Sequence, residues 1–387
     1  MRPKVLLVHA SLGSGHRRAA QALHEVLQEQ NVPADIQDLL SFLPLRLSSF
    51  YPACYDFMIN DCRWLWKLLY NALDKPARPY APGNSLLQKW QFTRFLRFLQ
   101  EQEFTHILST HFASSALLTD WRKNQKLSNT KIYSIVTDHI AHRCWKRTGL
   151  DHYFVPSEAV GRQLHSIGVP EESLTVSGIP VSKAFRELSL RAEARAAWAC
   201  ADGEKLFLVL CSGWNFKKTM LLLNELRSLQ GPYRFLVSTG PDPVKEQKIQ
   251  KLLKAQTNFT IFGFSPRIAE MMAAADLMIS KPGGLIVSEG LAMGLPQILL
   301  SPIPGQEEAN ARYAESRGAA ICVSGKKGAL LNAVDQLLKD SNRLCSMQQA
   351  AKAAGRPCAA TTIIEKVLAE QTRKPQSEPH TQRKEDH

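Results

Sequence analysis

A glycine-rich turn that ends in a histidine is the first feature of the chain that could do chemistry. Gly13, Ser14, Gly15 and His16 follow an apolar run and precede a segment with apolar residues at helical spacing. Such a turn leaves room for a ligand at a helix N-terminus, where free N–H groups favour an anion such as phosphate. A histidine, with an unperturbed pKa of about 6.5, could act there as a general base. The alternative is a helix cap beside a structural turn, and the spacing does not fit the G-x-G-x-x-G dinucleotide motif.

A second glycine turn lies in the C-terminal half. Lys281 and Pro282 are followed by Gly283 and Gly284, after an apolar run at residues 277–279. This turn predicts a second helix N-terminus that could bind a diphosphate, with Lys281 as a nearby cation. Glu289 lies about one and a half turns into that helix, where a carboxylate could accept hydrogen bonds from a ribose diol. Taken alone, a glutamate at such a position is more often a solvated helix residue.

A proline-fixed loop at residues 302–310 supplies side chains that bind hydroxyl groups well. Gln306, Glu307 and Asn310 lie in it. A bound sugar requires such a cluster of donors and acceptors. The alternative is an ordinary helix N-terminus with acids in its first turn.

The elements that must position these residues alternate between short apolar strands and helical stretches. We expect strands at residues 4–10, 107–109, 131–136 and 152–155, and again at 206–211, 234–238, 260–262, 277–279 and 297–300. This alternation predicts parallel sheets covered by helices, in two α/β domains. We place the domains at residues 1–180 and 181–370, and a polar, disordered tail at residues 371–387.

The motifs together resemble a known enzyme family, the lipid-directed glycosyltransferases related to monogalactosyldiacylglycerol synthase and the processive diacylglycerol glucosyltransferases. The residues that carry the resemblance are Gly13–His16, Thr137-Asp138-His139 with His142 and Trp145, Gly178-Ile179-Pro180, and the block 281–320. The resemblance covers most of residues 4–340. It implies a GT-B fold, in which two Rossmann-like domains face each other across a cleft.

The resemblance also implies roles for individual residues. His16 would be the catalytic base, and Asp138, His142 and Trp145 would orient it or contact the acceptor. The donor, a UDP-hexose, would be bound by the C-terminal domain and the first glycine turn, and the acceptor would be diacylglycerol or a related lipid. The expected donor-binding residues are Gly15, Ser212, Gly213, Phe264, Ser265, Lys281, Gly283, Gly284, Glu289, Gln306, Glu307 and Asn310.

No metal or other cofactor is expected. The chain has no D-x-D motif, so a carboxylate-held metal at the diphosphate is not indicated. Asp138 and His142 are four residues apart, but no third ligand follows at a typical spacing. The reaction would invert the anomeric carbon and give a β-linked glycolipid.

An insertion near residues 41–100 mixes aromatic and basic residues. Residues 62–100 carry seven Lys and Arg against Asp74, a balance of 7 − 1 = +6. Aromatic and cationic side chains suit the headgroup region of an anionic membrane. The residues expected at the membrane are Arg63, Trp64, Trp66, Lys67, Trp90, Arg94 and Arg97. The alternative is that the aromatic residues pack a core and the cations form a solvated face.

Composition narrows the choice of binding partner and of cellular location. The net charge is +13, which favours an acidic partner, but the basic segment fits no nucleic-acid-binding motif. The apolar run at residues 5–8 is too short for a signal peptide, and the eight cysteines form no C-x-x-C pair. We therefore expect a cytoplasmic protein bound peripherally to the cytoplasmic face of a membrane. Two other functions stay open: a UDP-GlcNAc transferase acting on a lipid-linked peptidoglycan precursor, and a non-catalytic UDP-sugar-binding protein.

Overall fold

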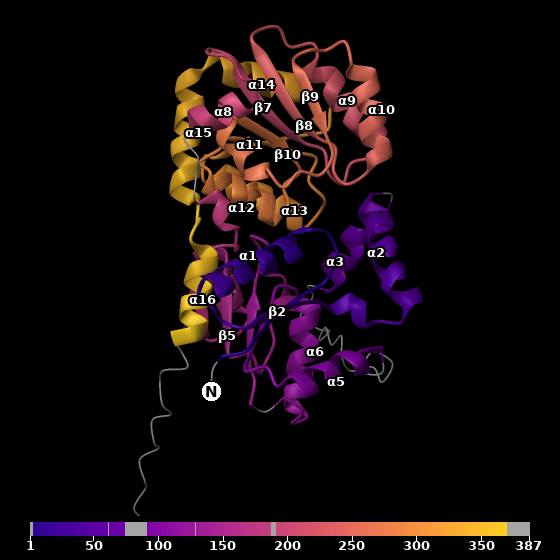
Figure 1. Cartoon of the computed structure of the whole chain (residues 1–387), viewed down its shortest axis with the longest axis vertical. Helices are drawn as coiled ribbons and strands as arrows, with labels where there is room; N and C mark the ends of the chain where they lie inside the picture. The colour runs from indigo at the N-terminus through magenta and orange to yellow at the C-terminus, as the bar shows by residue number, and fades with distance from the viewer. Residues whose placement is uncertain (1–2, 61, 74–90, 128, 187–190, 370–387) are drawn as a thin grey trace, which may run out of the picture.

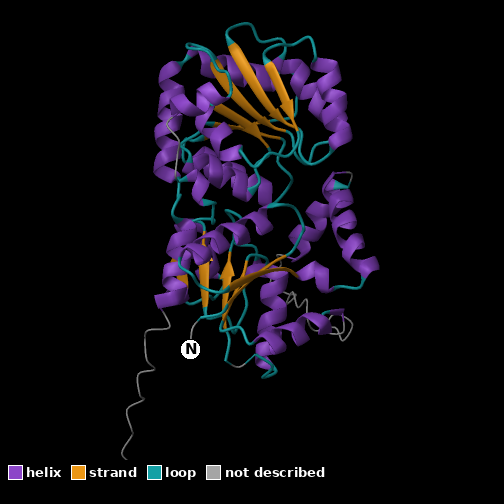
Figure 2. Cartoon of the chain, in the orientation of Figure 1, coloured by secondary structure: helices purple, strands orange, loops and turns teal. Residues whose placement is uncertain are grey.

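Two parallel β-sheets form the framework of the molecule. The computed structural model describes residues 3–60, 62–73, 91–127, 129–186 and 191–369. Each sheet has six strands, with helices on its faces (Figure 2). The central strands are mostly apolar and buried: Val5–His9 is buried along its whole length, and Lys205–Leu210 is buried at every position after Lys205, as parallel strands covered on both faces require.

The first sheet has the strand order β2-β1-β3-β4-β5-β6. Its strands are β1 Val5–His9, β2 Ala34–Asp38, β3 His106–Ser109, β4 Lys131–Ile135, β5 His152–Val155 and β6 Leu174–Val176. Its helices are α1 Gly15–Glu29, α2 Leu45–Asn60, α3 Arg63–Leu73, α5 Thr93–Gln102, α6 Phe112–Lys123 and α7 Glu158–Ser166.

The second sheet has the strand order β12-β11-β10-β7-β8-β9. Its strands are β7 Lys205–Leu210, β8 Tyr233–Ser238, β9 Phe259–Phe262, β10 Leu277–Ser280, β11 Gln297–Leu300 and β12 Ala320–Val323. The helices in this part of the chain are α8 Arg191–Ala197, α9 Phe216–Leu226, α10 Pro243–Leu253, α11 Ile268–Ala274, α12 Gly284–Ala292, α13 Gln306–Ser316, α14 Ala329–Lys339 and α15 Ser341–Ala354.

The last helix, α16 (Ala359–Ala369), returns to the first domain. Ile363, Ile364 and Val367 share a buried cluster with Leu23 and Leu27 of α1, and Figure 1 shows α16 beside α1. The assignment of residues 181–370 to the second domain therefore does not hold for α16. The apolar face of α16 completes the core of the first domain, a pairing that the sequence order does not reveal. The tail at residues 371–387 lies outside the described residues.

The insertion divides into a packed part and an exposed part. Phe95 and Leu99 of α5 are buried beneath the first sheet with Trp121, so the core-packing alternative is right for the aromatic residues of α5. Arg94 and Arg97 lie on its exposed face. Trp90 and the side chain of Arg63 lie outside the part of the chain that the structure describes.

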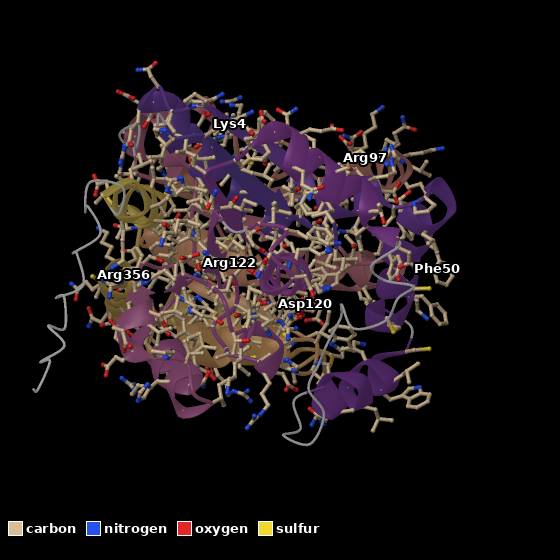
Figure 3. The ribbon with its side chains drawn as sticks, turned by 90° about the horizontal axis from the view of Figure 1, so that it is seen from below. Lys4, Phe50, Arg97, Asp120, Arg122 and Arg356 are labelled. Atoms are coloured by element: carbon tan, nitrogen blue, oxygen red, sulfur yellow. The ribbon has the colours of Figure 1, made fainter. Side chains whose placement is uncertain are left out.

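Helices α2 and α3 carry the exposed part. Trp64 is 67% exposed and Leu68 59%, whereas Trp66 is half-buried. On α2, Phe50 and Phe57 are 59% and 57% exposed, and Figure 3 shows Phe50 at the edge of the molecule. None of the helices described is both long and apolar enough to cross a bilayer.

Candidate active site

The two domains contact each other through the loops and helices that follow the carboxyl ends of their strands. Helix α1 follows β1, and α12 follows β10; the two helices lie side by side between the sheets (Figure 1). Helix α13 follows β11 and packs on α12. The loop after β4 reaches across from the first domain. Ligands of open parallel sheets bind at this strand end, so the predicted site residues lie where the fold favours a site.

His16 is held at this junction by hydrogen bonds to one side of its ring. Its Nδ1 atom lies 2.8 Å from the carbonyl oxygen of Thr110 and 3.0 Å from Oγ1 of Thr137. A carbonyl oxygen only accepts, so Nδ1 carries the proton and Nε2 keeps its lone pair. Thr110 also donates from Oγ1 to the backbone oxygen of His16 at 3.0 Å. The imidazole is therefore fixed in the tautomer that a general base at Nε2 needs.

The surroundings of His16 keep it neutral near pH 7. Burial lowers its pKa below the usual value, and this effect outweighs the opposite influence of Asp138 and of the Thr110 hydrogen bond. The ring of His111 meets the His16 ring edge-on, with centroids 4.7 Å apart. Burial holds the pKa of His111 well below its usual range, so His111 adds no positive charge. His16 is therefore available to accept a proton.

Asp138 reaches from the loop after β4 to side chains of the second domain. Its Oδ1 accepts a hydrogen bond from Asn310 at 3.1 Å, and its Oδ2 accepts one from Gln306 at 3.2 Å. Burial raises the pKa of the Asp138 carboxyl, opposed by His16 and by the Asn310 hydrogen bond. The side chain thus lies between the candidate base and two residues expected to bind the sugar. An orienting role for Asp138 stays a prediction.

His139 continues the same contact. Its backbone N–H donates to Oδ1 of Asn310 at 2.7 Å, and its Nε2 lies 3.2 Å from Oγ of Ser288 on α12. Its ring stacks on Tyr313 with centroids 3.8 Å apart. Burial lowers the pKa of His139 to about 3, so this histidine is neutral. Residues 137–139 therefore join the base to the donor-side helices.

Gly284 permits this close approach. A Cβ atom at Gly284 would lie 2.2 Å from the carbonyl oxygen of Thr137 and 3.1 Å from Oδ1 of Asp138. The first contact is with backbone, which cannot rotate away. A glycine at the start of α12 thus has a packing reason in addition to any role in binding a phosphate.

We predict that Gly284→Ala destabilises the protein, because the Thr137 loop must move to admit the methyl group. Overpacking of this kind costs about 1–3 kcal/mol. Thermal or denaturant unfolding would measure it. Gly161→Ala in α7 is the control, because its Cβ would lie 3.7 Å from Val155, an ordinary contact. Equal stability of the two variants would contradict the close contact between the domains.

Glu289 is deeply buried and paired across the domain boundary. Arg18 of α1 approaches its Oε1 at 2.5 Å, and the Glu289 side chain is only 2% exposed. Its Oε2 is buried without a hydrogen-bond partner. Burial raises the pKa of Glu289 to about 7, against the charge and hydrogen bond of Arg18. Glu289 is not a solvated helix residue, so that alternative is wrong.

Lys281 lies beside the two other motifs of the second domain. Its Nζ is 3.7 Å from Oε1 of Glu307, and a Cβ at Gly213 would lie 3.6 Å from the same Nζ. Glu307 also accepts a hydrogen bond from the backbone N–H of Ile303 at 2.8 Å. Gly283 is the N-cap of α12, Ser212 packs against Gly240, and Gly15 faces Leu285 across the junction. The structure therefore brings the predicted donor-side turns together.

Some predicted residues lie elsewhere. Trp145 is 2% exposed and packs edge-on against Phe112 in the core of the first domain, so its expected acceptor-side contact is replaced by a packing role. His142 is buried, and its Nδ1 accepts from the backbone N–H of Cys144. Phe264 and Ser265 follow β9, the strand at the edge of the second sheet. Phe264 is 73% exposed there.

Sequence reasoning missed several residues of this junction. Thr110, His111 and Arg18 carried no motif of their own. His111 caps α6, since its Nδ1 accepts from the N–H of Ala113, and its ring also touches His16. Only the position of Arg18, two residues after His16, could have marked it from the sequence.

Comparison with known proteins agrees with this arrangement. Residues 16–181 match the sequence model of the monogalactosyldiacylglycerol (MGDG) synthase family, and residues 211–363 match that of the glycosyltransferase family 28 C-terminal domain. Residues 16–181 are thus similar to the MGDG synthase family, and residues 211–363 to a glycosyltransferase domain. The resemblance drawn from the motifs is confirmed, and the chain is an enzyme.

Individual relatives share most of the length of this glycosyltransferase. A protein of Bacillus cytotoxicus named processive diacylglycerol beta-glucosyltransferase is 28% identical over 95% of this chain and 94% of its own. One of the same name from Bacillus pumilus is 24% identical over 94% of each chain. The expected activity class therefore agrees with the names of these relatives.

Solved structures show the fold. MurG of Acinetobacter baumannii superposes with a TM-score of 0.62 at 17% identity, covering 95% of this chain and 99% of its own. MnaA of S. aureus, solved with UDP, gives 0.65 at 13% identity, covering 97% and 99%. The predicted GT-B fold is confirmed.

Proposed function

We propose that this glycosyltransferase moves a hexose from a UDP-sugar to diacylglycerol at a membrane surface, with inversion, and so forms a β-glycosyldiacylglycerol. The proposal depends mainly on the tautomer of His16. Its Nδ1–H donates a hydrogen bond to the carbonyl oxygen of Thr110, so Nε2 can accept a proton beside the donor-side helices. A binding protein has no use for a base held in this way. The names of the relatives in the two Bacillus species supply the acceptor class.

The reaction is a single displacement. Nε2 of His16 takes the proton of the acceptor hydroxyl as its oxygen attacks the anomeric carbon. The bond from that carbon to the diphosphate oxygen breaks, and its electron pair leaves with UDP. Attack from the face opposite the leaving group inverts the anomeric centre.

The second domain supplies groups for the leaving diphosphate. The N-terminus of α12 begins at Gly284, and Lys281 lies next to it, 13% exposed. Helix N–H groups and a cation placed before the reaction stabilise charge as it develops on the leaving group. Gln306 and Asn310 donate hydrogen bonds to Asp138 in this structure. When the donor binds, these two side chains would instead hydrogen-bond to hydroxyl groups of the sugar.

Product analysis tests the proposal. The purified protein is incubated with liposomes containing diacylglycerol and with UDP-glucose, UDP-galactose or UDP-GlcNAc in turn. Mass spectrometry of the lipids identifies the sugar, and the proton coupling constant at the anomeric carbon gives its configuration. An α-linked product would overturn inversion. Transfer only to a lipid-linked peptidoglycan precursor would overturn the acceptor.

We predict that transfer needs no divalent metal, because helix N–H groups and Lys281 can act on the diphosphate in its place. Among the residues described, no group of three or more His, Cys, Asp or Glu side chains is arranged to hold a metal ion. Activity in excess EDTA should equal activity without it. A loss in EDTA that magnesium or manganese restores would contradict this prediction.

A further inference from the structure

Arg18 links the two domains at the carboxylate expected to bind ribose. It lies on α1, two residues after His16, and its side chain is 29% exposed. Its partner Glu289 is 2% exposed and belongs to α12 of the second domain. The half-buried member of the pair, Arg18, thus comes from the first domain, and the buried member, Glu289, comes from the second.

We propose that Arg18 is a positioning residue of the donor site, which holds Glu289 as a carboxylate so that Glu289 can accept hydrogen bonds from the ribose of the UDP-sugar. The inference rests on the proposed function, because it requires a uridine nucleotide as donor. It adds to that function a residue contributed across the domain boundary by the helix that carries the base.

The geometry of the pair supports this role. Arg18 occupies Oε1 of Glu289, whereas Oε2 is buried and has no hydrogen-bond partner. Buried polar atoms in proteins nearly always have a partner, so an unpaired carboxylate oxygen at a predicted ligand site indicates that a donor is missing. A ribose hydroxyl is such a donor. An ionised carboxylate accepts from two hydroxyl groups, whereas a protonated one has lost part of that capacity.

Burial makes the charge on Glu289 dependent on Arg18. Burial raises the pKa of Glu289 to about 7, and the charge and hydrogen bond of Arg18 lower it from a still higher value. The charge that lowers this pKa comes from α1. Helix α13 presents the neutral Asn310 toward the start of α12, and Lys352 of α15 lies with its stem against Gly294. The Lys281–Glu307 pair is at the N-terminal end of α12, and His16 is neutral.

The proposal predicts a pH-dependent loss of nucleotide binding in Arg18→Gln. An opposite charge at this distance is worth about one to three pKa units. If the pKa of Glu289 rises by one unit, from about 7 to about 8, the ionised fraction at pH 7 falls from about one half to about one eleventh. Affinity for UDP-glucose at pH 7 should then fall about fivefold and recover by pH 9. Calorimetric titration without acceptor measures it.

The controls separate this role from others. Arg17→Gln removes an exposed charge from the neighbouring position of α1 and should leave the pH profile unchanged. Arg18→Lys should keep most of the affinity at pH 7. A second titration compares UDP with 2′-deoxy-UDP at the same pH. The loss of affinity caused by Arg18→Gln should be smaller for 2′-deoxy-UDP, because this nucleotide lacks one of the hydroxyl groups that donate to Glu289.

The results that would overturn the proposal are distinct. A loss of equal size at pH 7 and pH 9, and for both nucleotides, would mean that Arg18 acts on the diphosphate or only holds the domains together. If Arg18→Gln does not fold, Glu289→Gln replaces it: its affinity should not vary with pH between 6 and 9, and a pH profile like that of the unmodified protein would exclude Glu289 as the titrating group. If the unmodified protein bound none of UDP-glucose, UDP-galactose and UDP-GlcNAc, that result would instead overturn the proposed function.

Discussion

Replacing His16 with alanine is expected to lower the turnover number by about 10²–10⁴-fold, which is the usual loss when a general base is removed. This corresponds to about 3–5 kcal/mol of transition-state stabilisation. The expectation follows from the Thr110 hydrogen bond, which places the only free lone pair of the ring at Nε2. Steady-state kinetics with saturating UDP-sugar and diacylglycerol vesicles would measure the loss.

The same helix offers a control of the same residue type. His24 lies eight residues further along α1, about 12 Å away, and its Nε2 contacts the carbonyl oxygen of Ala34. His24→Ala should therefore keep near-normal turnover. UDP binding by His16→Ala should remain close to that of the unmodified protein, since the donor-side residues are untouched. Near-normal turnover of His16→Ala would show that another group takes the proton.

The pH profile gives an independent check on the base. His16 acts in its unprotonated form, and burial lowers its pKa below 6.5. The turnover number should therefore be independent of pH near pH 7 and should fall only as the pH drops through this lowered pKa. If the turnover number already began to fall above pH 7 as the pH was lowered, His16 could not have the lowered pKa on which its assignment as the base depends.

Binding to anionic vesicles is expected to fall about a hundredfold when three exposed cations of α3 and α5 are reversed in charge. Lys67, Arg94 and Arg97 are exposed, and each basic residue near an anionic surface contributes about 1 kcal/mol. Loss of about 3 kcal/mol corresponds to roughly a hundredfold in partitioning. Replacing the three with glutamate should release the protein in a flotation assay, and raised salt should weaken binding of the unmodified protein.

The exposed apolar residues of α2 and α3 can be tested separately. Phe50, Phe57, Trp64 and Leu68 are exposed on α2 and α3, two helices that pack against each other. Leu68→Glu should weaken vesicle binding. Leu221→Glu on α9 is a matched control, because Leu221 and Leu68 are both 59% exposed. Equal flotation of these two variants would place the membrane-binding surface elsewhere on the molecule.

The strands show what a sequence can determine by itself. Every strand predicted from an apolar run is present, including the buried central strands β1, β3, β4, β7, β8 and β10. Strands β2, β6 and β12 were not predicted, and all three lie at sheet edges. Strands β2 and β6 pair on one side only, are partly solvated and contain polar residues, so they lack the continuous apolar run that marks a central strand. Strand β12 is a short apolar run, Ala320–Val323, that was not identified from the sequence.

The candidate active site also combines features that the sequence predicted with features that only the tertiary structure shows. The glycine turns and the side chains of residues 302–310 were evident from the sequence, because they depend on local backbone geometry and residue type. Their partners were not: Asn310 and Asp138 are 172 positions apart, and Arg18 meets Glu289 only because α1 and α12 pack together. Burial, which raises the pKa of Glu289 to about 7 and keeps His16 neutral, is a property of that packing. The sequence alone therefore identified the residue types and the local turns of the site. The contacts between these residues and their protonation states depend on how the two domains pack, because that packing decides which side chains touch and which are shielded from water.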